Sequence, residues 1–140
     1  MFRKHGPIFT AAFILCCLAV LPGCGHEQQL ESISIQPTTE TFGTATNPAP
    51  PGAQVQLRAL GSYIHPPVTK DITNVVTWTS NTPNIATVNS TGVVNVTGLA
   101  CGDALISATV TTNNSLGNLP SNGAIVTGFM TATVVCPSGP

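Results

Sequence analysis

Five cysteines hold most of the chemistry that this sequence of 140 residues offers. A cysteine thiol forms disulfides, binds metals, acts as a nucleophile or accepts a lipid, and its surroundings decide which. The cysteines fall into three groups, which are Cys16 with Cys17, Cys24 alone, and Cys101 with Cys136. Each group has neighbours of a different kind, so we expect a different fate for each.

The residues before Cys24 have the order of a secretory signal. Arg3 and Lys4 precede an apolar run from Ile8 to Leu21, and the small residue Gly23 stands directly before the cysteine. The run, which contains the first cysteine pair, is shorter than the roughly 20 residues that a helix needs to cross a hydrocarbon core. A membrane-spanning anchor is therefore the weaker alternative.

The segment Leu21-Pro22-Gly23-Cys24 resembles the lipobox of bacterial lipoproteins. The resemblance implies that a signal peptide of residues 1–23 is removed and that Cys24 becomes the first residue of the mature chain and carries the lipid. Pro22 departs from the usual pattern, which has Ser, Ala, Thr or Val at that place. Gly25 is not the aspartate associated with inner-membrane retention in some Gram-negative bacteria. We therefore expect a lipid-anchored protein of the cell envelope, at the outer membrane.

Cys101 and Cys136 are expected to form a disulfide. Cys101 stands just before a predicted strand that begins near Asp103, and Cys136 stands just after one that ends near Val135. If these strands are antiparallel neighbours, both cysteines fall at the same end, as a disulfide requires. Export to an oxidising compartment favours the bond over the alternative of two unpaired buried thiols.

No other residues form a catalytic or metal-binding pattern. His26 lies in the tether and His65 in a loop, so no pair has the spacing of metal ligands, and the acids are too sparse for a calcium site. The chain has no Gly-x-Ser-x-Gly motif. Arg58 and Lys70 are the strong bases left after signal removal, too few to bind a phosphate backbone. We predict a non-enzymatic protein without cofactor, metal or nucleic-acid partner.

Two aromatic residues of the predicted domain have different expected roles. Trp78, the only tryptophan, alternates with Val76 in a predicted strand and is expected to fill the core. Tyr63 lies beside Gly61 and the His65-Pro66-Pro67 turn, and it is the candidate for an exposed aromatic that contacts a ligand. A packing role is the stronger alternative for Tyr63.

The elements that would position these residues are short strands. Apolar residues alternate with polar ones in seven segments, near residues 33–35, 55–59, 76–78, 86–88, 94–96, 104–110 and 130–134. Turn-forming residues separate them, which is typical of a β-sandwich or small barrel. Two proline-bearing insertions, residues 41–52 and 111–127, interrupt the pattern. They carry no charged or aromatic cluster, so we expect mobile loops there rather than binding loops.

The order and spacing of several segments from Leu30 to Val135 resemble the bacterial Ig-like domain of group 2. The matching segments include Leu30-Glu31-Ser32-Ile33-Ser34-Ile35, Asp71-Ile72-Thr73, Val76-Thr77-Trp78-Thr79-Ser80, Ile85-Ala86-Thr87-Val88 and Gly102-Asp103-Ala104-Leu105-Ile106-Ser107-Ala108-Thr109. The resemblance implies an all-β, immunoglobulin-like β-sandwich of about seven strands, used as a spacer or adhesion module without catalytic activity. The expected organisation is a signal peptide at 1–23, a lipidated tether at 24–29, the Ig-like domain at 30–136 and a tail at 137–140.

Two functions from different classes follow. The first is an anchored structural or protein-interaction module with an adhesion role, whose partners are the membrane and an envelope protein. The alternative is a carbohydrate-binding module that holds a glycan through Tyr63 and the loops at 41–52 and 111–127. We prefer the first, because these loops do not concentrate the groups of a ligand pocket.

Overall fold

The computed structural model describes residues 28–111 and 125–139, and these residues form ten strands. The strands are β1 (Gln29–Gln36), β2 (Thr39–Phe42), β3 (Gln54–Gln56), β4 (Arg58–Ile64), β5 (Val68–Asp71), β6 (Thr77–Ser80), β7 (Ala86–Val88), β8 (Val93–Val96), β9 (Gly102–Thr111) and β10 (Ile125–Val134). Every predicted alternating segment coincides with or overlaps a strand, which confirms the all-β prediction. Within these residues there is no helix with the length and apolar character needed to cross a membrane.

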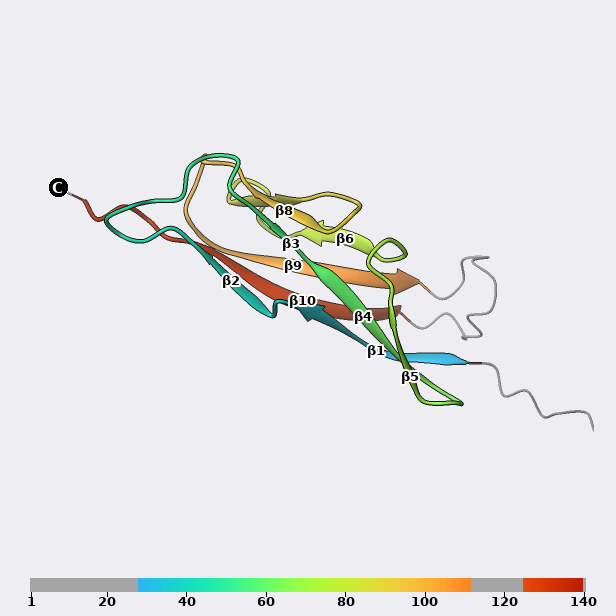
Figure 1. Cartoon of the computed structure of the whole chain (residues 1–140). Coiled ribbons are helices and arrows are strands. Elements are labelled where there is room, and N and C mark those ends of the chain that lie inside the picture. The colour runs from blue at the N-terminus through green and yellow to red at the C-terminus, as the bar shows by residue number, and fades with distance from the viewer. Residues whose placement is uncertain (1–27, 112–124, 140) are drawn as a thin grey trace, which may run out of the picture.

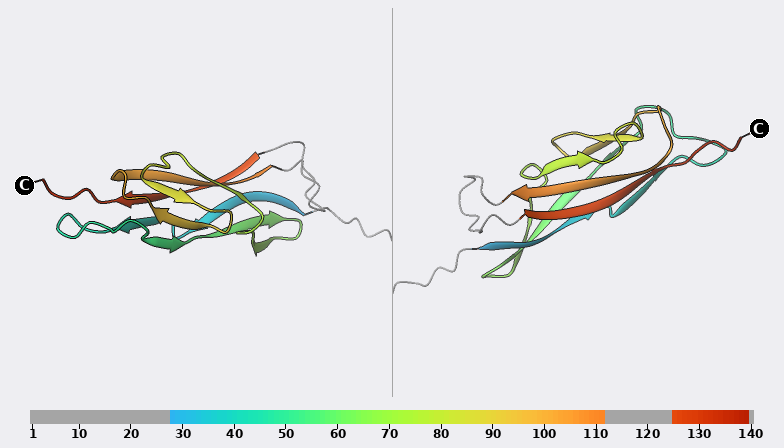
Figure 2. Two further views of the ribbon diagram at one scale, coloured as in Figure 1. Left: turned by 90° about the horizontal axis from the view of Figure 1, so that it is seen from above. Right: turned by 180° about the vertical axis from the view of Figure 1, so that it is seen from behind.

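The strands form the two layers of a β-sandwich. One layer is a four-stranded sheet in the order β2-β10-β9-β6. The other contains the sheets β1-β4-β5 and β3-β8-β7, which follow each other along the layer because Leu57 alone separates β3 from β4. Figures 1 and 2 show β9 and β10 side by side, with β1 and β4 across from them.

The first strands connect the layers. β1 pairs antiparallel with β4, and the chain then passes a cis Gln36–Pro37 peptide before β2 pairs in parallel with β10. Successive segments of the N-terminal region therefore belong to opposite layers. The last long strand, β10, is thereby flanked by β2 on one side and by β9 on the other.

The core lies between the layers and follows the alternation of the sequence. β9 contributes Ala104, Ile106 and Ala108, which are fully buried, and β10 contributes Met130 and Ala132. Burying such side chains is the main favourable term in folding. Trp78 is also part of this core, with 9% of its surface exposed, which confirms its predicted packing role.

The structure corrects the expectation of seven strands. The predicted segment at 55–59 belongs to two strands, β3 and β4, which Leu57 separates. β2 and β5 were not predicted, because β5 is exposed along its whole length and β2 buries only Phe42, so neither shows a period of two. The segment at 41–52, for which a mobile loop was expected, contains a hydrogen-bonded turn. Residues Thr44 and Asn47 exchange backbone hydrogen bonds of 2.8 and 3.1 Å, and Ser138 donates to the carbonyl of Ala45. Most of the second insertion, residues 112–124, lies outside the described residues.

Gly128 of β10 lies very close to the backbone of β1 in the opposite layer. A Cβ at this position would lie 2.5 Å from the backbone oxygen of Ile33 in β1. We expect Gly128→Ala to lower the free energy of unfolding by roughly 1–3 kcal/mol, the usual cost of overpacking a core. Chemical denaturation measures the change. Gly139→Ala is the control, since a Cβ there meets nothing within 4 Å, and equal stability of the two variants would contradict this account.

Candidate functional site

The disulfide of Cys101 and Cys136 closes one end of the β9–β10 pair. Gly102 and Val134 are the last partners of this pair, and the cysteines lie directly beyond them. Their sulfur atoms are bonded and their Cα atoms are 5.1 Å apart, which is the pairing that the sequence predicts. The bond links residues 35 positions apart. It therefore holds the open end of the longest strand pair.

An apolar groove of about 310 Å³ lies beside the disulfide. Leu99 is 79% exposed at this groove, and Ala49, Ala100 and Pro137 line it with other small or apolar residues. Apart from backbone atoms and the bonded sulfur of Cys101, these residues supply no polar group. The groove offers shape and apolar contact but no catalytic chemistry.

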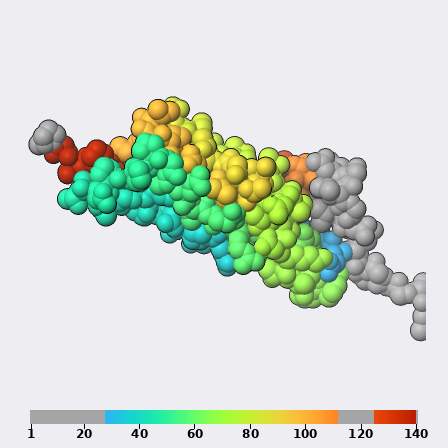
Figure 3. Space-filling model, turned by 45° about the horizontal axis from the view of Figure 1, so that its top comes forward, coloured from blue at the N-terminus to red at the C-terminus, as the bar shows by residue number. Residues whose placement is uncertain are grey.

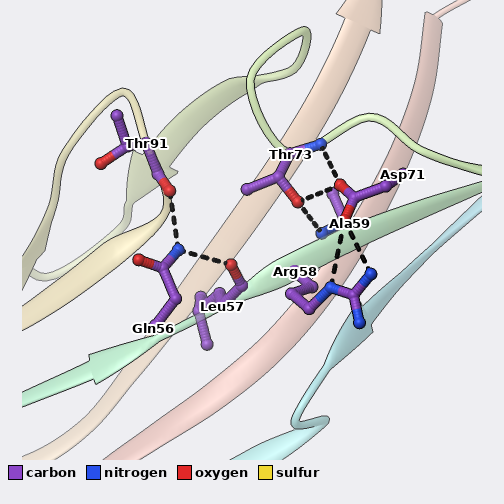
Figure 4. Close-up of polar contacts among 7 residues, drawn as sticks. All are labelled: Gln56, Leu57, Arg58, Ala59, Asp71, Thr73 and Thr91. Carbon is purple, nitrogen blue, oxygen red and sulfur yellow. Dashed lines mark hydrogen bonds and ion pairs between the residues drawn. The ribbon is translucent and has the colours of Figure 1, made fainter.

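A second and more polar groove lies where β3 meets β4. Its lining includes Gln56, Arg58, Asp71, Thr73 and Thr91. Figure 4 shows two groups of contacts in this groove: Arg58 and Thr73 reach Asp71, and Gln56 reaches the backbone carbonyls of Leu57 and Thr91. Mixed donors and acceptors in a hollow are the usual sign of a ligand site. Whether they bind a ligand depends on how many of their hydrogen-bonding positions are left open.

All four acceptor positions of Asp71 are filled from within the domain. Oδ2 accepts from Nε and Nη2 of Arg58 at 3.1 and 2.9 Å. Oδ1 accepts from the backbone N–H of Thr73 at 3.0 Å and from its hydroxyl at 2.6 Å. A carboxylate offers about four lone-pair sites, so none remains for a ligand. The Thr73 bonds, with a smaller effect from Arg58, lower the pKa of Asp71 from 3.8 to about 2.

Thr73 connects the two layers of the sandwich. Its hydroxyl oxygen accepts from the backbone N–H of Ala59 in β4 at 3.0 Å, while its own proton goes to Asp71. Its carbonyl accepts from Nε1 of Trp78 in β6 at 2.9 Å. Thr73 is the buried polar side chain of the described core, so these bonds satisfy groups that water does not reach.

Gln56 is used in the same way. Its Nε2 donates to the carbonyls of Leu57 and Thr91, at 2.8 Å each. Both amide protons are therefore committed to the backbone of the domain itself. The hydrogen bonds of Gln56, Asp71 and Thr73 in the polar groove therefore hold segments of the domain itself together. Within residues 28–111 and 125–139, no three His, Cys, Asp or Glu side chains gather closely enough to hold a metal ion.

A comparison with known protein families gives a match to this architecture. The model of the bacterial Ig-like domain (group 2) matches residues 31–116. The chain belongs to this family. The match covers β1 to β9, while β10, which completes the four-stranded sheet, lies beyond it. No match is found among curated proteins.

In this Ig-like domain, Tyr63 is buried in the core, which agrees with the packing role that was its stronger alternative and not with an exposed aromatic that contacts a ligand. Only 8% of its surface is accessible, because alternation along β4 points Ala59, Gly61 and Tyr63 to the core. Burial raises the pKa of the Tyr63 hydroxyl. Lys70 of β5 lies over the ring, with Nζ 4.9 Å from its centre. No face of Tyr63 is left as a stacking platform for a ligand.

Cys24 was predicted as a site residue, whereas the contacts of Asp71 and Thr73 were not predicted. Cys24 lies outside the described residues, so its lipidation stays a prediction. The Asp71 and Thr73 brace was not predicted as a site, although Asp71-Ile72-Thr73 is among the segments that resemble the Ig-like family. An Asp two residues before a Thr is a signal for a side-chain turn, and this signal identifies the local bond. It does not identify the bond to Ala59.

Ionisation of Asp71 should make the free energy of unfolding of the Ig-like domain depend on pH in the acidic range. The pKa of Asp71 is lower in the folded chain, so its contribution is complete above pH 4 and is lost as the pH falls through about 2. We expect Asp71→Asn, which does not titrate, to show a smaller loss of stability between these values. Thermal unfolding across this window measures it. Glu31→Gln, which removes another exposed carboxylate, is the control; identical acid profiles for Asp71→Asn and the native chain would contradict the assignment.

The disulfide should contribute a large share of the stability of the Ig-like domain. For a loop of 35 residues, the chain-entropy relation gives roughly 3–4 kcal/mol. We expect the double variant Cys101→Ser and Cys136→Ser to unfold at a correspondingly lower denaturant concentration. Adding reductant to the native chain should reproduce the shift and should leave the double variant unchanged. A native chain that does not respond to reductant under unfolding conditions would exclude this contribution.

Proposed function

We propose that this chain is a lipid-anchored structural or protein-interaction module of the cell envelope, without enzymatic activity of its own. The observation that carries the proposal is the state of the polar groove. Asp71, Thr73 and Gln56 direct their hydrogen bonds into the domain, so the groups that resemble a site are part of the scaffold. A rigid sandwich of this kind offers surfaces to a partner rather than a pocket to a substrate.

The tether supports a position close to the membrane. β1 begins at Gln29, so a lipid on Cys24 is separated from the domain by a linker that extends to only about 17 Å, at 3.3–3.6 Å per residue. The start of β1 and the C-terminal tail lie at opposite ends of the elongated domain (Figure 3). The disulfide and the apolar groove at Leu99 would therefore face away from the membrane, toward a partner within the envelope. Gly25 favours the outer membrane.

Carbohydrate binding has less support. The hypothesis placed a glycan on Tyr63 and the loops at 41–52 and 111–127; both Tyr63 and Trp78 are buried, and residues 112–124 lie outside the described residues. The turn at residues 44–47 is closed by its own hydrogen bonds, so it does not offer a row of free donors. No observation on the described surface favours a glycan at these places, and we retain the interaction module as the proposal.

The anchor is tested by intact-mass spectrometry of the full protein recovered from membranes of cells that produce it. We expect a chain that starts at Cys24, carries added acyl mass and gains two hydrogens on reduction of its disulfide. Cys24→Ala should abolish the acyl mass and release the protein from the membrane fraction. A native chain that retains residues 1–23, or that lacks the acyl mass, would refute the anchoring.

A further inference from the structure

The charges of the domain are distributed unequally between its two layers. Glu31, Arg58, Lys70 and Asp71 all lie on the sheet β1-β4-β5, at exposed positions. The outer face of the sheet β2-β10-β9-β6 carries one charged residue, Asp103, whose Oδ1 accepts a 2.6 Å hydrogen bond from the hydroxyl of Thr133. With one charged residue among the outward side chains of four strands, this outer face is nearly neutral, as expected for a chain with only 6% charged residues.

The strand register shows which side chains form this neutral face. They are the outward residues of each strand, opposite to the buried ones. Four rows cross the sheet, Thr41-Thr133-Asp103, Thr39-Thr131-Leu105, Phe129-Ser107-Thr79 and Thr127-Thr109-Thr77, and Ile125-Thr111 forms the end. Glu40 is not part of this face, because its register partner is the buried Ala132. The neutral face is therefore mostly threonine.

Three large apolar side chains lie exposed within the neutral face. Phe129 is 57%, Ile125 67% and Leu105 39% exposed. Phe129 and Leu105 are diagonal neighbours on adjacent strands, since Phe129 pairs with Ser107 and Leu105 with Thr131. An aromatic and an aliphatic residue surrounded by small neutral residues have the arrangement of an interface centre and its rim.

We propose that the neutral face binds the same face of a second copy of this chain. A charged partner would lose hydration here without gaining an opposite charge, so the face selects a neutral surface. On the described chain, the exposed side of the sheet β1-β4-β5 carries charged residues and is not such a neutral surface, whereas the neutral face is. Asp103 lies one row from the end of the β9–β10 pair, outside the apolar centre. Two such faces stack as two sheets do in a sandwich, about 10 Å apart.

The contact is weak in dilute solution and gains from confinement. The outward residues of four short strands are fewer than the roughly 20–30 residues a side of a standard stable interface. Copies held on one membrane meet at a high effective concentration, which turns a weak contact into a populated one. The gain from confinement rests on the proposed membrane anchor. The acyl mass on Cys24 tests the anchor, and cross-linking tests the contact between neutral faces.

The test is cross-linking of the full chain in membranes isolated from cells that produce it. Ser107→Cys places a thiol beside Phe129, and Ser34→Cys places one on exposed β1 in the charged layer. Stacked sheets are too far apart for a direct disulfide, so a short bismaleimide joins the thiols. We expect Ser107→Cys to give a band of twice the chain mass at several-fold higher yield than Ser34→Cys. Adding Phe129→Asp should reduce that band several-fold.

Each other outcome overturns the proposal. Equal yields from the two positions would mean random collision, and an unchanged band with Phe129→Asp would mean that the apolar centre plays no part. A product at another mass would assign the face to a different protein, and absence of any product would leave the face uncovered. The chain without an added cysteine sets the background. Phe129 is exposed, so its variant is expected to keep the Cys101–Cys136 bond, which a non-reducing gel checks.

Discussion

The hydrogen bonds of Thr73 are the constraint on which the two layers of this domain depend. The Trp78 indole is buried in the core and carries a proton that needs an acceptor, and the Thr73 carbonyl provides it. The hydroxyl of the same residue satisfies Ala59 in the opposite layer. Because an unpaired buried polar group costs about 1–3 kcal/mol, one residue fixes the position of a large aromatic and of a central strand together.

The same constraint explains why the polar groove is not an open site. Thr73 keeps its orientation only if its proton has an acceptor, and Asp71 supplies that acceptor while Arg58 holds Asp71. The ion pair is exposed and contributes little by itself, with side-chain exposures of 60% and 44%. Its role is to orient the carboxylate that orients Thr73. The polar groove therefore resembles a binding site because its exposed side chains support the buried hydrogen bonds of Thr73.

The two layers differ in the interactions that hold them and in the residues on their outer faces. The layer with β4 and β5 holds the brace and the charges, and it presents a solvated surface. The layer with β9 and β10 is held by the long register pairing of these strands and by the disulfide at their end, and its outer face carries one charged residue, Asp103. On this face Phe129 is exposed among mostly threonine side chains.

Much of the fold was determined by the sequence through local patterns. The alternation of β9 and β10, the burial of Trp78 and the meeting of Cys101 with Cys136 all follow from a period of two and from antiparallel pairing of neighbouring strands. Edge strands escape this rule. β5 has no buried side chain, and it pairs with β4 through backbone hydrogen bonds. Its sequence therefore shows no alternation of apolar and polar residues.

Other features were decided only by the tertiary structure. Tyr63 sits near turn residues in the sequence, yet the register of β4 turns it inward, because a shift of one residue would exchange the two faces of a strand. The bond from Ala59 to Thr73 and the neutrality of the outer face likewise need residues from separate strands. The local sequence determines that side chains alternate between the two faces of a strand. Only the packing of the layers determines which of the two faces is buried and which is exposed to water.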